Sequence, residues 1–297
     1  MGDSMSVVER RLARVVTTPP AAPGFIGPGH TAVTVLEARD FAEQDPFIAL
    51  MDDRLDLTPG AEAGAAHPHA GFETVTFVLE GELHDPDEGV LRAGDVQWMT
   101  AGSGIIHGEH VVPHGFTRIL QLWLALPPHA RWTSPRFETV YRDDAPVIRE
   151  PGAMVRVYSG GSGDVVAPTR NHVPVTLADV ALEPGASISL DVPASYNGFV
   201  LAIDGSVTVG SDGIAVGKGQ AGWLDRVDAA GPGVLRLTGG PEGARVVLYA
   251  GEPQRAPLVT HGPFVGGTRA DLVRASHDFV NGRFPRMSEL LRAARPT

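Results

Sequence analysis

From Thr31 onward, apolar residues occur in short runs of β type that Gly, Pro and Asp interrupt. The first set of runs comprises Thr31–Leu36, Phe72–Leu79, Asp95–Met99 and Thr117–Leu126. The second set comprises Val175–Leu182, Ala186–Val192, Gly198–Ile203, Gly233–Leu237 and Arg245–Ala250. Many short strands separated by turn residues predict an antiparallel β sandwich or barrel, so we expect an all-β fold.

One hairpin pattern occurs in each set of strands. Residues 78–83 read Val-Leu-Glu-Gly-Glu-Leu and residues 202–207 read Ala-Ile-Asp-Gly-Ser-Val, each with an acidic-Gly turn. Gly94 and Trp98 follow the first turn, and Gly219 and Trp223 follow the second at nearly the same intervals. We therefore predict two tandem copies of one β-barrel unit.

The connection between the copies is expected within Arg142–Asn171, where Pro and Gly are frequent and periodicity is weak. A boundary near Pro151 gives an N-terminal domain of residues 1–150 and a C-terminal domain of residues 151–297. Two domains of this size are ordinary for a chain of 297 residues.

A short helix is expected near the end of the chain. Thr268 and Asp271 have the spacing of a capping box. Leu272, Ala275 and Phe279 would then form one apolar stripe along the helix. Such a stripe predicts a helix that packs one face against a core.

Composition restricts the partners and ligands available to the chain. The formal net charge of -11 disfavours direct binding to nucleic acid, which depends on Lys and Arg. Because there is no Cys, metal ligands must come from His or carboxylates. Residues 1–14 lack the apolar stretch of a signal peptide and no apolar run reaches membrane-spanning length, so we expect a cytoplasmic protein without a membrane segment.

Histidines cluster in the first copy, which contains His67, His69, His84, His107, His110 and His114. Residues two apart on a strand point to one face, so His67 and His69 can converge on one point, as can His107 and Glu109. Three neutral imidazoles and one carboxylate suit one divalent transition metal, and Fe(II), Mn, Co, Ni, Cu and Zn all accept such ligands. Four protein ligands would leave coordination positions of the metal open for water, oxygen or substrate, as in a catalytic site.

Other residues compete for places in this site. Glu73 shares the strand parity of His67 and His69 if the strand runs through Gly71, so it is an alternative to Glu109. His84, His110 and His114 fit the geometry less well and are expected to lie outside the ligand set.

The second copy is not expected to bind a metal. Asp191 and Pro193 occupy the positions that align with His67 and His69, and no histidine follows Trp223 in the matching segment. The scattered His172, His261 and His277 are expected to be surface or packing residues.

Two motifs surround the histidine pairs. Residues 67–75 read His-Pro-His-Ala-Gly-Phe-Glu-Thr-Val, with Leu-Glu-Gly at 79–81, and residues 94–109 read Gly-Asp-Val-Gln-Trp-Met-Thr-Ala-Gly-Ser-Gly-Ile-Ile-His-Gly-Glu. Asp45-Pro46-Phe47 and Gly262-Pro263-Phe264-Val265 accompany them. These motifs resemble the cupin superfamily and, more narrowly, the pirin family, over most of the chain.

The resemblance implies a bicupin, with two jelly-roll-like barrels and an iron-type metal in the N-terminal one. It implies that His67, His69, His107 and Glu109 hold the metal, and it favours Glu109 over Glu73 as the fourth ligand. The sequence departs from pirins at Ala70, where Arg is usual, and at His110, where Met is common. The Gly81–Gly94 hairpin is also short. The missing arginine changes the charge expected at the pocket entrance without changing the ligands.

Two functions of different classes follow from the resemblance. The first is a metal-dependent dioxygenase that opens quercetin or a similar flavonol or enediol, with Glu109 or Glu73 as general base and with Phe72, Trp98 and Met99 as pocket walls. The second is a non-enzymatic, iron-dependent redox regulator that binds a protein partner.

Overall fold

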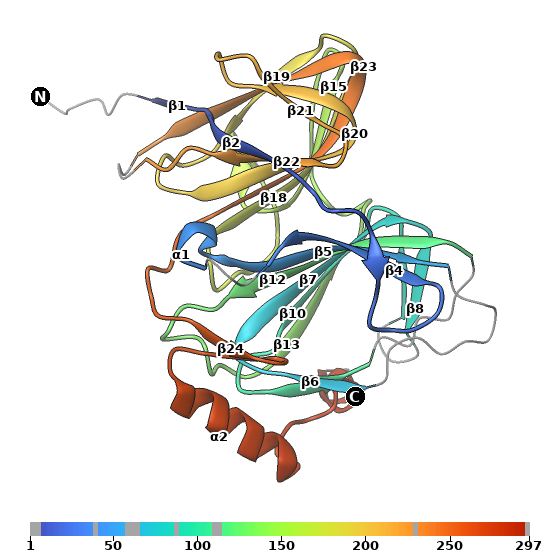
Figure 1. Ribbon diagram of the computed structural model, residues 1–297, viewed down its shortest axis with the longest axis vertical. Coiled ribbons are helices and arrows are strands. Elements are labelled where there is room, and N and C mark those ends of the chain that lie inside the picture. Colours follow the sequence, from blue (N-terminus) through green and yellow to red (C-terminus); the bar gives the residue numbers. More distant parts are fainter. Residues whose placement is uncertain are drawn as a thin grey trace, which may run out of the picture. The chain divides into compact units, whose positions relative to one another are not determined.

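The structure is a computed structural model that describes residues 7–37, 41–56, 66–85, 89–108, 115–227 and 231–294. Strands dominate it, with two helices near the C-terminal end (Figure 1). The fold is all-β and is built on two large sheets, as expected for two copies of one β unit. None of the described helices is long and apolar enough to cross a membrane.

The chain divides into two compact units, each built from two separate segments. The histidine unit contains Pro19–Arg142 and the segment that begins at Gln254. The second unit contains the strands that precede Pro19 and Asp143–Pro253. The terminal segments are therefore grouped differently from the expected domains of residues 1–150 and 151–297.

The histidine unit is built on a seven-stranded sheet with the order β13-β10-β7-β12-β5-β4-β3. Its strands are β3 (Ala22–Pro23), β4 (His30–Leu36), β5 (Phe47–Leu55), β7 (Phe72–Glu80), β10 (Val96–Thr100), β12 (Thr117–Ala125) and β13 (Arg136–Val140). Paired ribbons complete it: β6 (His67–His69) with β11 (Ile105–His107), β8 (Glu82–Asp85) with β9 (Gly89–Arg92), and β24 (Val259–His261) with β25 (Phe264–Gly266). A short helix, α1 (Phe41–Gln44), precedes β5.

The strand that carries the first histidine pair is interrupted before it enters the main sheet. Ala70 forms an isolated parallel bridge with Phe264, and its backbone N–H donates to the carbonyl of Pro263 at 3.2 Å. Gly71 follows with a φ of 86°, in the left-handed region that favours glycine. A Cβ at Gly71 would lie 1.9 Å from the carbonyl oxygen of Val265, so the close approach of β25 also requires glycine there.

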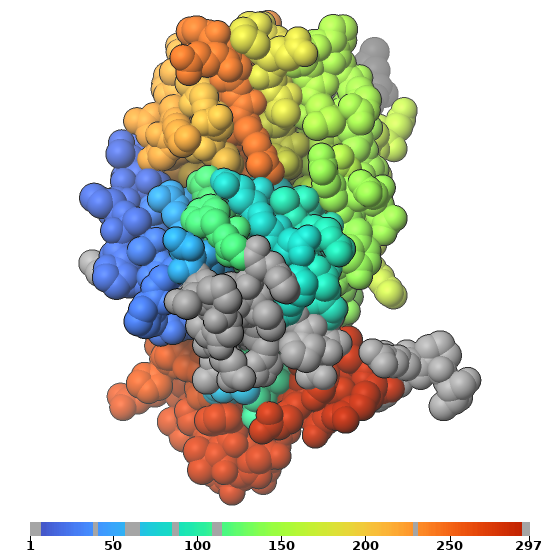
Figure 2. All heavy atoms as spheres, turned by 90° about the vertical axis from the view of Figure 1, so that its right-hand side faces the viewer, coloured from blue at the N-terminus to red at the C-terminus, as the bar shows by residue number. Residues whose placement is uncertain are grey.

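The C-terminal segment folds back on this unit through two helices, α2 (Arg269–Val280) and α3 (Met287–Ala294). The predicted capping box of α2 is confirmed, because the side chains of Thr268 and Asp271 each bind the other's backbone N–H. Leu272 and Ala275 are buried together with Ala70 and Phe264. Figure 1 shows α2 and β24 beside β6, and Figure 2 shows the red C-terminal residues against teal and blue strand residues. The second helix, α3, was not expected from the sequence.

The second unit contains a ten-stranded sheet, whose main path is β14-β15-β18-β23-β20-β22-β2. Its strands are β1 (Val8–Arg10), β2 (Leu12–Thr17), β14 (Val147–Glu150), β15 (Ala153–Ser159), β18 (Val175–Leu182), β19 (Ser187–Asp191), β20 (Asn197–Val209), β21 (Ile214–Gly217), β22 (Gln220–Leu224) and β23 (Gly233–Gly251). A small ribbon joins β16 (Gly161–Ser162) to β17 (Val165–Val166). Two of the predicted strands merge into the long β23.

The N-terminal strands belong to the second unit because their backbone groups and the buried guanidinium of Arg10 find their hydrogen-bond partners there. Strand β1 pairs with β23, and β2 pairs with β22. Arg10 has a fully buried side chain that donates to the carbonyl oxygens of Pro193 and Tyr196 and to the carboxylate of Asp225. Removing one partner of such a buried charge is costly, which fixes this segment on the unit.

The internal repeat predicted from the hairpins is visible in the strand register. Trp98 pairs with Val75, and Trp223 pairs with Phe199. Val75 and Phe199 each precede their turn glycine by the same number of residues, and both turn glycines, Gly81 and Gly205, have positive φ. The two sheets thus repeat one arrangement of strand, turn and returning strand.

We predict that Gly71→Ala lowers the free energy of unfolding by about 2–4 kcal/mol, because both φ and the contact with Val265 oppose a side chain. Gly89→Ala is the matched control, since Gly89 has a φ of 94° but nothing within 4 Å of a built Cβ. It should cost only about 1 kcal/mol. Urea denaturation measures both changes, and equal losses would show that the close approach of β25 is unimportant.

Candidate metal centre

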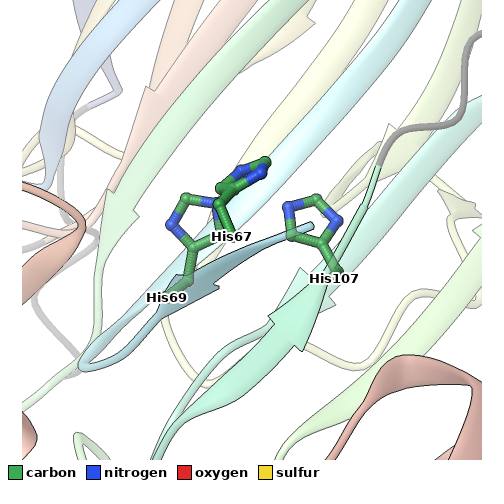
Figure 3. Close-up of side chains that lie close together, drawn as sticks. All are labelled: His67, His69 and His107. Atoms are coloured by element: carbon green, nitrogen blue, oxygen red, sulfur yellow. The ribbon is translucent and has the colours of Figure 1, made fainter. Parts of the chain in front are cut away.

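The first two predicted ligands lie on β6 and the third lies on β11, and these strands pair antiparallel. His107 is directly opposite His67, and Ile105 is opposite His69. Residues that face one another on paired strands, and residues two apart on one strand, share a face. Figure 3 shows the consequence, with three imidazoles that project from the ribbon towards one another.

The three imidazoles are close enough to bind one ion. One possible ligand atom from each of His67, His69 and His107 lies within 4.8 Å of those of the other two. The ring centroids are 4.6 Å apart for His67 and His69, 4.7 Å for His67 and His107, and 5.0 Å for His69 and His107. Within the described ranges, this is the one group of three or more His or carboxylate side chains with such spacing.

The surroundings keep two of these rings neutral. Burial, followed by the neighbouring His107 and His67, lowers the pKa of His69 well below its usual value. Burial and then His67 lower the pKa of His107 to about 3. Neutral imidazoles offer lone pairs, which are the electrons that a transition metal needs. The donor set therefore fits a divalent metal.

A cavity of about 170 Å³ extends from the imidazoles across the inner face of the sheet. Its lining is mostly apolar and comprises Phe25, Ile26, Ala49, Met51, Asp53, Leu55, His67, His69, Thr74, His107, Ile119, Gln121 and Trp123. Trp123 contacts His69 edge to face, with ring centroids 5.6 Å apart. A cavity of this size admits a small molecule.

Of the two carboxylates predicted as metal ligands, the structure describes only Glu73. Glu109 lies outside the described residues. Glu73 is buried and faces Thr100, whose hydroxyl donates to its Oε1 at 2.7 Å, and its carboxylate is not part of the histidine group. The interruption at Gly71 explains this, because the alternation of faces restarts there and Thr74 lines the cavity in its place. The expected parity of Glu73 with the histidines is corrected. Burial raises the pKa of Glu73.

The predicted pocket residues Phe72, Trp98 and Met99 do not line the cavity. All three are fully or almost fully buried in the core. Phe72 supports the site from behind, because its ring contacts His69 and Trp123 with centroid distances of 5.2 and 4.3 Å. The expectation that these three form the pocket wall is corrected in this structure.

The cavity lining on β5 was not predicted from the sequence. Ala49, Met51, Asp53 and Leu55 line it at alternate positions. This period of two is the signal that could have identified the strand, which was absent from the predicted set. Gln121 was also missed, and its Oε1 accepts a hydrogen bond from Thr76 at 2.9 Å.

Of the three other histidines named in this part of the sequence, the structure describes His84, which is not part of the group. His84 is hydrogen-bonded to Glu82 at 2.9 Å on the β8–β9 ribbon. His110 and His114 fall outside the described residues. Across the described part of the second unit, no comparable group of His and carboxylate side chains occurs.

The fold and the site define a bicupin with a candidate metal centre in one barrel, and comparison with known proteins gives its family. Residues 33–124 match the pirin family, and residues 177–285 match the pirin C-terminal cupin domain. Pirin of Homo sapiens is 31% identical over 254 residues, which cover 80% of this chain and 82% of that protein. The chain therefore belongs to the pirin family.

Two further relatives carry the name of the same enzyme, quercetin 2,3-dioxygenase. A Pseudomonas aeruginosa protein provisionally named quercetin 2,3-dioxygenase is 36% identical over 231 residues, which cover 74% of this chain and 78% of that protein. The solved structure of quercetin 2,3-dioxygenase from Acinetobacter baumannii is 28% identical, with a TM-score of 0.82, and the match covers 93% of this chain and 99% of that one.

We predict that the metal-free protein loses stability as the pH falls from 6.5 towards 3. In that range the unfolded chain protonates His107, whose ordinary pKa is 6.5, whereas the folded chain does so only at about 3. Protons therefore favour unfolding, by up to about 1.4 kcal/mol per pH unit for each such group. Urea denaturation at several pH values measures the slope. His107→Gln should reduce it, and an unchanged slope would contradict the assignment.

Proposed function

We propose that His67, His69 and His107 hold one divalent transition metal, with Glu109 as the fourth ligand. The support is the convergence of three imidazoles on β6 and β11 within 4.8 Å. Glu109 enters the proposal because it follows His107 by two residues within the pirin-like motif. We propose Fe(II) as the resident ion, although imidazole and carboxylate ligands also accept Mn, Co, Ni, Cu and Zn.

The reaction we propose is the oxidative ring opening of quercetin or a related flavonol by dioxygen. The observation that carries it is the position of the three imidazoles in the wall of a mostly apolar cavity. A metal held there would supply Lewis acidity and redox chemistry to a flavonol hydroxyl group. The names of the Pseudomonas and Acinetobacter relatives support the same activity.

The residues of the chain itself would bind and orient the substrate. Apolar side chains such as Met51 and Ile119 exclude water from the reacting rings. Trp123 offers an aromatic surface beside His69, and the amide of Gln121 is a polar contact along the cavity. We assign the general base to Glu109, because Glu73 is directed to Thr100 on β10.

We predict that His69→Ala and His107→Ala abolish stoichiometric metal binding without unfolding the protein, because each removes one of three facing imidazoles. His84→Ala is the matched control in the same unit, and His172→Ala is a second control in the other unit. Metal analysis after gel filtration measures the content, with circular dichroism as the test of folding. Full metal content in both site variants would defeat the ligand assignment.

Oxygen uptake by Fe(II)- or Mn(II)-loaded protein with quercetin tests the activity. We expect rapid uptake that falls at least 100-fold in His69→Ala, where the contribution of free metal remains. No uptake by protein with confirmed bound metal would contradict the proposed reaction. The alternative of a redox regulator with a protein partner stays a prediction, which that result would favour.

A further inference from the structure

The cavity has a second polar group at a distance from the imidazoles. Asp53 lines the cavity on β5, and its side chain is only 8% exposed. Among the described residues, its side-chain hydrogen-bond partner is His30, whose Nε2 lies 2.8 Å from Oδ1 of Asp53. Burying a carboxylate costs free energy unless its oxygens accept hydrogen bonds. A carboxylate held by a single side chain at a cavity wall is therefore suited to a donor from a ligand.

The surroundings of His30 fix the orientation of its ring. The backbone N–H of Ile26 donates to Nδ1 of His30 at 3.1 Å. Because Nδ1 accepts this bond, the ring proton lies on Nε2 and is donated to Asp53. Gly24 packs against the ring so closely that a Cβ there would lie 2.1 Å from Nδ1. His30 is thus a fixed donor that positions Asp53 and occupies only one of its two oxygens.

The two polar ends of the cavity are well separated along the sheet. Trp123, which contacts His69, pairs with Ala49 on β5, whereas Asp53 pairs with Ile119 on the same β12. Asp53 lies four residue steps along the strand from Ala49, a distance of about 13 Å. Met51 lines the cavity between them. The ligand that satisfies both ends is elongated, apolar in its middle and polar at each end.

An aromatic side chain stands beside the distal end. Phe25 lies in the turn between β3 and β4, lines the cavity and is 82% exposed. Its ring meets His30 edge to face, with centroids 5.5 Å apart. An exposed aromatic ring at a cavity wall can cover a flat ligand, which favours a planar aromatic molecule over a flexible chain.

We propose that Asp53, positioned by His30, accepts a hydrogen bond from a hydroxyl group on the ligand ring that lies farthest from His67, His69 and His107. Asp53 is then the residue that selects hydroxylated over unsubstituted aromatic ligands. This inference rests on the proposed function, which places one end of the ligand at the metal. It adds the substrate class, which is multi-ring phenols with a hydroxyl group at the end that reaches Asp53.

Binding under anaerobic conditions tests the inference without turnover. The probes are 3-hydroxyflavone and its 7-hydroxy and 4′-hydroxy derivatives, titrated into the metal-loaded protein by absorbance or calorimetry. We expect one derivative to bind about tenfold more tightly than 3-hydroxyflavone, as a hydrogen bond to a carboxylate allows. Asp53→Asn should reduce this preference to less than twofold, because the amide oxygen accepts from His30 and the amide N–H₂, which cannot accept, then faces the ligand.

Asp52→Asn is the matched control. Asp52 is the neighbouring carboxylate on β5 and forms two hydrogen bonds of 2.8 Å with Arg118. It does not belong to the cavity lining. Its loss should lower stability without changing the ratio of the affinities. If the ratio changes equally in both variants, the effect is structural and the inference is overturned.

His30 provides a second test of positioning. His30→Gln keeps an N–H for Asp53 and should retain most of the preference for the hydroxylated ligand, whereas His30→Phe should lose it. A preference that survives in both Asp53→Asn and His30→Phe overturns the inference even if quercetin is oxidised. A preference that depends on Asp53 without oxygen uptake supports the inference and contradicts only the proposed reaction.

Discussion

The candidate site depends on one constraint, which is that the histidine strand cannot run straight into the main sheet. Strand β25 approaches the backbone so closely at Gly71 that only glycine fits, and the positive φ adopted there turns the chain. The face that carries His67 and His69 continues in Thr74 instead of Glu73. The same contact ties the C-terminal segment to the ribbon that presents the imidazoles.

This constraint explains how the histidine unit combines a polar site on one ribbon with an apolar cavity on the main sheet. The β6–β11 ribbon presents His69 and His107, whose pKa values are lowered by burial, while the neighbouring strands supply apolar walls. Low polarity strengthens the interaction of any ion with its ligands and removes competing water. Polar groups inside the cavity are few, and two of them, Asp53 and Gln121, are each held by a hydrogen bond to a neighbouring side chain. Such an arrangement suits the aromatic ligand that we propose.

Much of the fold could be predicted from the sequence because it is encoded in local patterns. The repeated acidic-Gly turns, the β-type runs and the capping box at Thr268 all depend on nearby residues. The convergence of His67, His69 and His107 could be predicted because residue spacing on a strand determines which side chains share a face.

The errors concern features that depend on distant segments. Nothing near Glu73 in the sequence shows that β25 closes on Gly71 and changes the parity of the strand. The place of the N-terminal strands in the second unit depends on Pro193 and Asp225, far along the chain. The distal end of the cavity was missed for the same reason, because His30 and Asp53 meet only through the pairing of β4 with β5.

X-ray absorption at the metal edge of the loaded protein, recorded without and with a flavonol under anaerobic conditions, tests most directly whether the three histidines form a substrate-binding metal centre. We expect scattering from three imidazole rings in both spectra and a changed set of light-atom neighbours when the flavonol is added. Fewer imidazoles, or a spectrum that the flavonol leaves unchanged, would contradict a substrate-binding metal centre formed by His67, His69 and His107.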